Sequence, residues 1–397
     1  MLDAVRGMAV VGILHANLMS FFGADMLDDA ARRALPFSAA GDAVLFAIDW
    51  LVEGKFYSVF SMLLGAGFAL QATIAAREGR QGFPAFFRRR MIVLVAIGAG
   101  HMFGLWSGDI LMLYGLLGLL LPWLWRWPPR ARLTLMAGLF AMPLATHGVV
   151  LATAGRADPR PPFAAAGAAL RERWGIADRS TLDVFARGSS AEYYAWNTAN
   201  AVVRPGTYLQ SGRPEKVLAL FLLGAWLAST TLSSLHAQRA ALWRTVAIGG
   251  GIGLAGSFVY ASIKAATRST FLLSGTGLLQ TAAYTLGTTP LALAYLAAAA
   301  LAWQHPVGQR VLGWFVPIGR MALSAYVSQS VVQLLLFSSH GARLAGRVPF
   351  VWLPVVAAGI IVGQRVICAW WLRGHQQGPL EWIWRHLAYG TATASAR

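Results

Sequence analysis

Cysteine is almost absent from this sequence, whose 397 residues include only Cys368, in an apolar run. A single cysteine can form neither an intrachain disulfide nor a thiolate metal cluster. Charge is also scarce, because charged residues make up 12% of the chain, whereas a soluble domain carries about 25%. With 57% hydrophobic residues and a mean hydropathy of +0.55, the composition places the chain in the membrane class.

Acidic residues are the scarcer charged type, with 16 Asp and Glu against 33 Lys and Arg. After Glu215 the only carboxylate is Glu381, so carboxylate chemistry must draw on the first half of the chain or on Glu381. The net charge of +17 would suggest nucleic acid as a partner of a soluble protein. Here the arginines stand in short loops between apolar runs, which is typical of membrane anchoring, so we expect no nucleic acid.

Apolar runs of about 20 residues recur and predict an all-α, polytopic membrane helix bundle of about ten transmembrane helices. Residues 1–397 form a single integral membrane domain in this interpretation. The first run has Asp3 and Arg6 before it and no convincing cleavage site, so it is expected to be a span and not a signal peptide. The predicted spans are 2–22, 55–76, 88–106, 109–127, 131–154, 214–232, 242–263, 283–303, 318–338 and 350–373.

Loop charge predicts the topology. The loop 23–54 is mainly acidic, whereas the loop 77–90 and the loops around Arg130 and Arg239 are basic. The positive-inside rule therefore predicts that both termini are cytoplasmic. Residues 155–213 become a long outward-facing loop between helices 5 and 6, and residues 374–397 a cytoplasmic C-terminal tail. The long loop either carries short helices that cap an outward cavity or is a spacer.

The most informative stretch is Gly98–Gly118, where two apolar runs meet in the turn Trp106–Asp109. Ionisable residues inside a membrane are costly and are usually functional, so His101 and Asp109 are candidates for general-base chemistry on a hydroxyl or amine. The structural alternatives are that Asp109 caps the next helix and that His101 is a packed histidine bonded to a carbonyl. Four glycines of this stretch are expected to allow close helix packing: Gly98, Gly100, Gly104 and Gly108.

Other polar residues are expected near the outer and the cytoplasmic faces of the membrane. His15 and Asn17 lie in the outer half of the first span, and Glu53 and Lys55 lie where the second begins. His15 has the same structural alternative as His101. On the cytoplasmic side, Arg6 and Arg320 either bind phosphate or carboxylate or anchor their helices at the headgroups. The sequence has no Walker A, HExxH or GxSxG motif, and we expect no metal site.

Five motifs, in order along nearly the whole chain, resemble the YeiB-type bacterial membrane proteins, the family defined by domain of unknown function 418 (DUF418). They are Leu2–Ala9 followed by Asn17; Lys55-Phe56 with Phe60–Gly67; His101 with Trp106, Gly108–Leu111 and Tyr114-Gly115; Gly319–Ser324 with Tyr326 and Gln329; and Gly378–Arg385. The resemblance implies a bacterial plasma (inner) membrane location and a link to the transmembrane acyltransferase superfamily. That superfamily includes the acyltransferase-3 proteins and lysosomal heparan-glucosaminide acetyltransferase.

Members of this superfamily pass an acyl group, typically from cytoplasmic acetyl-CoA, to a sugar or similar acceptor across the membrane. In acyltransferase-3 proteins a histidine follows the first-helix Arg-Gly, ten residues after the arginine, and here Asn17 occupies that register. His15 is two residues off the register and does not inherit the role, which leaves His101 as the natural replacement.

The leading hypothesis is therefore an integral membrane acyltransferase that moves an acyl group from a cytoplasmic CoA thioester to an extracytoplasmic acceptor. His101 would be general base or transient acyl acceptor, Asp109 would orient it, and Asn17 would stabilise the oxyanion. Arg6 and Arg320 would hold the phosphates of acyl-CoA, a co-substrate and not a tightly bound cofactor. Residues expected near the acceptor are Glu53, Lys55 and Trp106.

One rival is a transporter or exporter of a small anionic or amphipathic solute, and another is a non-enzymatic membrane scaffold. The expected partners are the lipid bilayer and a small-molecule acceptor or solute, and the sequence also allows a homo-oligomer.

Overall fold

The computed structural model describes residues 1–230 and 239–389, and within these ranges it is helical with no strand. A helix lies over every predicted span, although residues 231–232 of the sixth span and 390–397 of the predicted tail fall outside the described ranges. The helices that cover the predicted spans are α1 (Leu2–Phe22), α4 (Lys55–Arg77), α5 (Phe83–Gly104), α6 (Leu111–Gly118), α7 (Leu121–Leu124), α8 (Pro129–Ala152), α12 (Arg213–Thr230), α13 (Arg239–Arg244), η1 (Thr245–Gly249), α14 (Gly250–Thr267), α15 (Gly275–Trp303), α17 (Val316–Arg320), α18 (Ala322–Phe337), η2 (Phe350–Trp352) and α19 (Leu353–Gly374).

Six stretches of the described chain are long and apolar enough to cross a membrane. They are Leu2–Phe22, Ser38–Arg77, Pro129–Ala152, Arg239–Thr267, Gly275–Trp303 and Phe350–Gly374. Two further apolar helices, Leu111–Leu124 and Ala322–Phe337, are shorter. The peripheral helices expose large apolar side chains, among them Val149 on α8, Phe258 on α14 and Val366 on α19. Exposed apolar faces of this kind favour contact with lipid, which supports membrane association.

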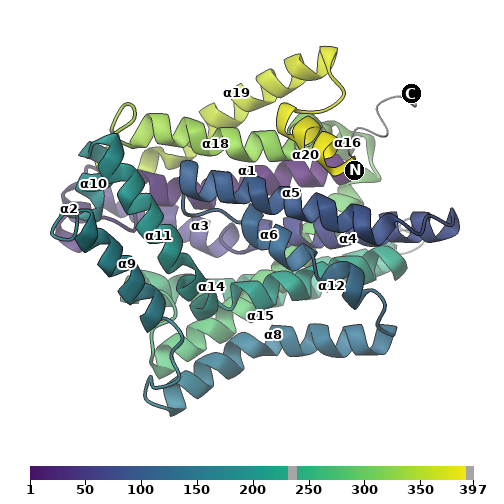
Figure 1. Cartoon of the computed structure of the whole chain (residues 1–397), viewed down its shortest axis with the longest axis horizontal. Coiled ribbons are helices and arrows are strands. Elements are labelled where there is room, and N and C mark those ends of the chain that lie inside the picture. The colour runs from purple at the N-terminus through teal and green to yellow at the C-terminus, as the bar shows by residue number, and fades with distance from the viewer. Residues whose placement is uncertain (231–238, 390–397) are drawn as a thin grey trace.

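The two ends of the bundle differ (Figure 1). The N-terminus and α20 (Pro379–Tyr389) lie at one end, here called the terminal end. At the opposite end, here called the loop end, lie α2 (Asp29–Ala34), α9 (Pro161–Arg173) and α10 (Thr181–Arg187). α1 lies in the interior and contacts α4, α17, α18 and α19, while α12 packs along α4 and α15 along α14.

Both long predicted loops contain helices. Residues 23–54 include α2 and the apolar α3 (Ser38–Leu51), and residues 155–213 include α9, α10 and α11 (Ser190–Ser211). α11 begins with a capping box in which Ser189 and Glu192 satisfy each other's free backbone amides. It then buries Tyr193, Trp196 and Asn197 against the rest of the protein. The second loop is therefore a packed part of the bundle and not a spacer.

Glycine allows close packing at only part of the predicted set. A Cβ atom built on Gly98 would lie 2.2 Å from the backbone nitrogen of Met112, so α5 and α6 approach closely there. On Gly108 it would collide with the Trp106 ring. Gly100 and Gly104 have nothing within 4 Å of such an atom, and the prediction is wrong for these two. Elsewhere α4 and α12 cross at Gly65 and Gly224.

Candidate functional site

The hairpin between α5 and α6 holds a buried histidine–carboxylate pair. Nδ1 of His101, in the last turn of α5, lies 2.9 Å from Oδ1 of Asp109, and the two side chains are 1% and 0% exposed. The other carboxylate oxygen, Oδ2, accepts a hydrogen bond of 2.7 Å from the backbone N–H of Met112. Asp109 therefore caps α6, as one alternative predicted, and contacts His101 at the same time.

The His101–Asp109 contact has the distance of an ion pair, but its angle is outside the range of a hydrogen bond. The Nδ1 and Oδ1 atoms have no hydrogen-bond partner of suitable geometry. Hydrogen bonds of catalytic groups are often poorly aligned without substrate and tighten when it binds. The two atoms are therefore within hydrogen-bond distance, and alignment is what the contact lacks.

The other ring nitrogen of His101 meets a serine from the second half of the chain. Nε2 lies 2.8 Å from Oγ of Ser330 on α18, and the ring of Tyr326, one turn earlier, is centred 5.1 Å from the imidazole. With Asp109 facing Nδ1, the favoured tautomer carries its proton on Nδ1 and leaves the Nε2 lone pair to accept a hydroxyl proton. Ser330, His101 and Asp109 thus follow the order of a hydroxyl, a base and an orienting carboxylate.

The helix α11 fixes the backbone of the hairpin. The Asn197 side chain accepts a hydrogen bond from the N–H of Ser107 and donates one to the carbonyl of Met102. Tyr193 donates its hydroxyl to the carbonyl of Leu105, and Tyr208 donates to the carbonyl of Asp109. Sequence reasoning gave none of these residues a role at the site. The run of aromatic and amide residues at 192–197, inside a predicted loop, was the available signal.

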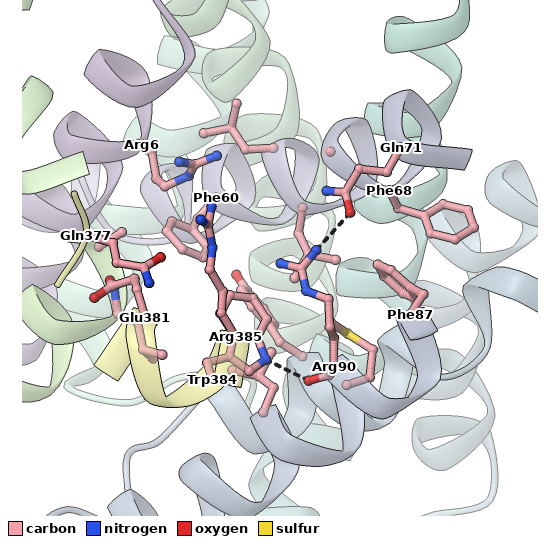
Figure 2. A pocket seen from close by; sticks show the side chains of 18 of the residues that line it. Arg6, Phe60, Phe68, Gln71, Phe87, Arg90, Gln377, Glu381, Trp384 and Arg385 are labelled. Carbon is pink, nitrogen blue, oxygen red and sulfur yellow. Dashed lines mark hydrogen bonds between the residues drawn. The ribbon is translucent and has the colours of Figure 1, made fainter. Parts of the chain in front are cut away.

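A cavity of about 810 Å³ opens at the terminal end, and we call it the arginine-lined cavity (Figure 2). Five arginines line it: Arg6, Arg80, Arg90, Arg320 and Arg385. Its deeper wall is largely apolar and includes Phe60, Leu64 and Leu94. It ends at Ile110, Tyr114 and Tyr326, and therefore next to the His101 ring.

The helix α20 closes one side of this cavity and brings two of the motifs into contact, Gly378–Arg385 and Gly319–Ser324. Glu381 accepts hydrogen bonds from the N–H groups of Leu323 and Ser324 and from the Ser324 hydroxyl, which caps the start of α18. Trp384 donates its indole N–H to the carbonyl of Arg90 (Figure 2). Glu381 is therefore bound to backbone and hydroxyl donors and has a structural role at the mouth.

The two arginines predicted to hold phosphate both line the arginine-lined cavity. Arg6 is paired with Asp3 on its own helix at 2.6 Å, and Arg320 donates to the carbonyl of Gln376 at 2.8 Å. Sequence reasoning placed Arg385 on the same cytoplasmic side as these two, but it did not connect Arg80 and Arg90 with them, because these come from the α4–α5 connection and from α5.

A second hollow, of about 60 Å³, lies on the other side of Tyr326, and we call it the small pocket. Its polar lining includes Asn17, Glu53, Arg204 and Arg213. It shares Ile13, Ile110 and Tyr326 with the arginine-lined cavity, so these three residues form the wall between the two spaces. The predicted residues Asn17 and Glu53 thus both line this pocket. His101 and Asp109 line neither space, but the His101 ring lies beside Tyr326 of the wall.

Three further residues singled out in the sequence, His15, Lys55 and Trp106, line neither of the two spaces. His15 bonds through Nδ1 to the carbonyl of Val11, one turn back, which is its predicted structural alternative. Lys55 is fully buried and donates to the backbone carbonyl of Asp49. Trp106 packs against Phe21, with ring centroids 4.4 Å apart. Neither Lys55 nor Trp106 is among the residues that line the two spaces, so these predicted contacts with an acceptor find no support in the geometry.

A family model described as "Protein of unknown function (DUF418)" matches residues 227–391. The chain is 29% identical to the uncharacterized protein YeiB of Escherichia coli (strain K12), over 98% of this chain and 96% of the relative. It is 26% identical to the uncharacterized protein YxaH of Bacillus subtilis (strain 168), over 98% of this chain and 93% of the relative. No solved structure has significant similarity to the chain.

Proposed function

Because the chain belongs to the YeiB-type DUF418 family, we propose its activity from the chemistry of the site: it is an integral membrane acyltransferase. It moves an acyl group, typically acetyl, from a cytoplasmic CoA thioester to a hydroxyl or amine of an extracytoplasmic acceptor such as a sugar. The observation that carries the proposal is the buried His101–Asp109 pair, with Nε2 already 2.8 Å from the Ser330 hydroxyl. That geometry is what general-base activation of a hydroxyl requires.

The arginine-lined cavity suits the acyl donor. Guanidinium groups at its mouth match the phosphates of CoA, and the apolar depth matches the pantetheine arm and the acyl group. A bilayer core is about 30 Å thick, so a donor confined to the surface would not reach the hairpin. A cavity that extends from Arg320 at the mouth to Tyr326 beside His101 supports delivery through the protein.

The proposed step transfers one acyl group and returns the proton to the leaving thiol. Nε2 of His101 takes the proton of the acceptor hydroxyl while the hydroxyl oxygen attacks the thioester carbonyl. The carbon–sulfur bond then breaks, and His101 gives the proton to the CoA thiolate. Asp109 stabilises the imidazolium between these transfers, and the Asn17 amide donates to the oxyanion. The step needs the Ser330 hydroxyl to give up its contact with Nε2 to the acceptor hydroxyl. It also needs Tyr326 to move aside, because Tyr326 stands between His101 and both spaces.

The proposed setting is the bacterial inner membrane, with ten transmembrane spans and both termini in the cytoplasm. The terminal end would then be cytoplasmic and the loop end extracytoplasmic. This orientation is supported by the basic stretches at the α4–α5 connection, which holds Arg80, and at the start of α8, which holds Arg130. It would let the arginine-lined cavity open to the compartment that contains CoA.

One observation also suits a transporter, namely that two spaces approach a single wall from opposite sides. Alternating opening of this wall would let a small anionic or amphipathic solute pass without covalent change. The acyltransferase is favoured because a pathway does not require a histidine held between a carboxylate and a hydroxyl.

Purified protein in proteoliposomes separates the two functions. With [1-¹⁴C-acetyl]CoA outside and glucose, glucosamine or glucuronate inside, an acyltransferase produces labelled, acetylated sugar that is chemically distinct from the donor. Movement of the unmodified sugars with no labelled product would support the transporter and contradict the proposal.

A further inference from the structure

The small pocket has more positive than negative charge in its wall. Arg204 and Arg213 line it, and Glu53 is the only acidic residue among its lining residues. A guanidinium keeps its proton in proteins, so both arginines are charged here. Both arginines are partly buried, and a charge that is partly removed from water is stabilised by an ion of opposite sign, so the surplus of guanidinium groups favours an anion.

Arg213 is only weakly paired. The nearest oxygen of Glu53 is 3.8 Å from its terminal nitrogen, which exceeds hydrogen-bond distance. Its guanidinium lies 5.1 Å from the centre of the Tyr57 ring and 5.9 Å from that of Tyr208. Its Nε atom is buried and has no hydrogen-bond partner in the part of the chain that the structure describes. These contacts hold the guanidinium plane in place and leave donors available.

Arg204 makes similar contacts and also packs on the ring of Tyr208. Its guanidinium lies 4.8 Å from the centre of the Tyr208 ring, and its Nε is also buried without a partner. One terminal nitrogen makes a long hydrogen bond of 3.4 Å to the carbonyl of Gly108. Tyr208 in turn donates its hydroxyl to the carbonyl of Asp109. Both arginines are therefore attached to the turn that carries Asp109.

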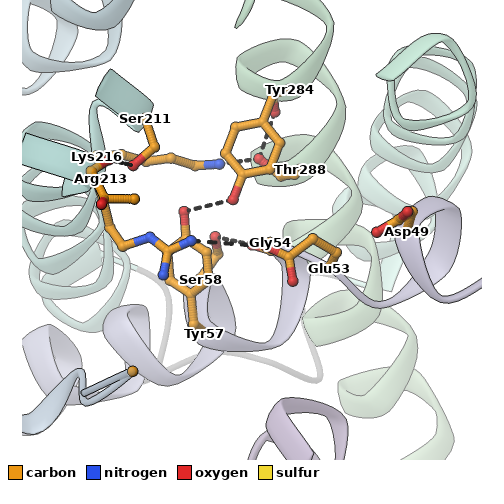
Figure 3. Close-up of polar contacts among 12 residues, drawn as sticks. Asp49, Glu53, Gly54, Tyr57, Ser58, Ser211, Arg213, Lys216, Tyr284 and Thr288 are labelled. Carbon is orange, nitrogen blue, oxygen red and sulfur yellow. Dashed lines mark hydrogen bonds and ion pairs between the residues drawn. The ribbon is translucent and has the colours of Figure 1, made fainter. Parts of the chain in front are cut away.

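Two buried lysines lie close to the pocket, and Figure 3 shows Lys216 beside Tyr57, one of the pocket's lining residues. Lys55 and Lys216 are 0% and 2% exposed. The Lys55 side chain donates to the carbonyl of Asp49, and that of Lys216 donates to the hydroxyl of Thr288. The carboxylate of Asp49 is itself paired with Lys264 at 2.7 Å. Glu53 is thus the nearby carboxylate left to offset the charge of the arginine pair.

We propose that the small pocket is an anion-binding subsite, in which Arg204 and Arg213 bind a carboxylate or phosphate group of the acyl acceptor. Guanidinium groups recognise both anions by paired N–H donors. The acceptor would then be an acidic sugar or a similar molecule with its anionic group a few atoms from the hydroxyl or amine that is acylated. This inference rests on the proposed function only in naming the ligand as the acceptor.

Binding measured without acyl-CoA tests the subsite independently of catalysis. Protein in lipid nanodiscs is dialysed to equilibrium against ¹⁴C-labelled glucuronate, glucose 6-phosphate or glucose. We expect at least about tenfold tighter binding of one or both anionic sugars than of neutral glucose, because charged hydrogen bonds to the two arginines add to the binding free energy. Comparison of the two anions tells carboxylate from phosphate, and competition by inorganic phosphate tests whether the free ion suffices.

Three variants are expected to change the affinity for the anionic sugar, two of them downward and one upward. A folding defect could only lower the affinity, so the upward change separates recognition from a folding defect. Arg204→Gln and Arg213→Gln are each expected to weaken binding of the anionic sugar about tenfold, whereas Glu53→Gln is expected to strengthen it severalfold by removing the competing carboxylate. Arg187→Gln, an exposed arginine of α10, is the matched control and should leave binding unchanged.

Equal binding of glucuronate, glucose 6-phosphate and glucose would overturn the subsite, as would anion binding that is unaffected by Arg204→Gln and Glu53→Gln. Acetyl transfer to a neutral sugar alone, with no anion binding, would leave the acyltransferase standing and reject the subsite. Anion binding with no acetyl transfer would support the subsite and reject the acyltransferase.

Discussion

Nε2 of His101 lies 2.8 Å from Oγ of Ser330, a residue 229 positions later in the chain. This contact joins the α5–α6 hairpin to α18, and α18 is also the helix whose start is capped by Glu381 of α20. The candidate site is thus assembled from both halves of the chain, next to a wall that separates two spaces.

Ser330→Ala tests what this contact does. In the proposed mechanism the acceptor supplies the attacking hydroxyl, so the variant should keep measurable acetyl transfer. It should lose about 1–3 kcal/mol of stability because the buried Nε2 loses its partner. Thermal unfolding in detergent and transfer rates in proteoliposomes measure the two effects. Complete loss of transfer, with acetylated Ser330 found by mass spectrometry of the native protein, would instead make Ser330 a covalent intermediate.

Asp109→Asn and Asp109→Ala separate orientation of the histidine from capping of the helix. An asparagine oxygen can still accept the N–H of Met112, so Asp109→Asn should retain most of the stability while transfer falls about 10²-fold to 10⁴-fold. Asp109→Ala should lose about 1 kcal/mol more, because the cap is also removed. Equal transfer by the wild type and Asp109→Asn would show that the carboxylate has no part in the reaction.

The mouth arginines are expected to act on donor binding. Arg320→Gln and Arg385→Gln should each raise the KM for acetyl-CoA about tenfold with little change in kcat, since a contact to a remote phosphate is the same in the ground and transition states. Arg373→Gln, an exposed arginine outside the cavity, is the matched control. Steady-state kinetics with acetyl-CoA and dephospho-CoA derivatives measure the effect. A fall in kcat at unchanged KM would contradict the assigned role.

Gly98 and Gly100 form a matched pair for the packing of the hairpin. Gly98→Ala would place a methyl group 2.2 Å from the backbone nitrogen of Met112, so it should destabilise the protein and displace α6 from α5. Gly100→Ala meets nothing within 4 Å and should stabilise the helix by about 0.5–1 kcal/mol. Thermal unfolding of both variants in one detergent compares them. Similar behaviour would mean that α5 and α6 do not touch at Gly98.

The sequence predicted the parts of the site whose signal is local. A helix coincides with each predicted apolar run, and His101 and Asp109 stood out because a histidine and a carboxylate are costly in membrane. Ser330 could not be found in this way, because serine is common in membrane helices, where its hydroxyl usually bonds to its own backbone. Asn197 and Tyr208 reach the hairpin over 90 and 99 positions, which no local pattern encodes. The contact of Lys55 with the carbonyl of Asp49 could not be predicted, because the direction of its side chain from the start of α4 depends on packing against distant helices.

Acetyl transfer by His101→Ala is the most direct test of the central claim. Wild type, His101→Ala and the matched control His15→Ala are compared in proteoliposomes with ¹⁴C-acetyl-CoA and the sugar acceptors, after size-exclusion chromatography shows that each variant is folded. The account predicts that His101→Ala loses transfer by about 10²-fold or more. His15→Ala should retain transfer, because the His15 ring is bonded to a carbonyl of its own helix. Undiminished transfer by a folded His101→Ala protein would contradict the account.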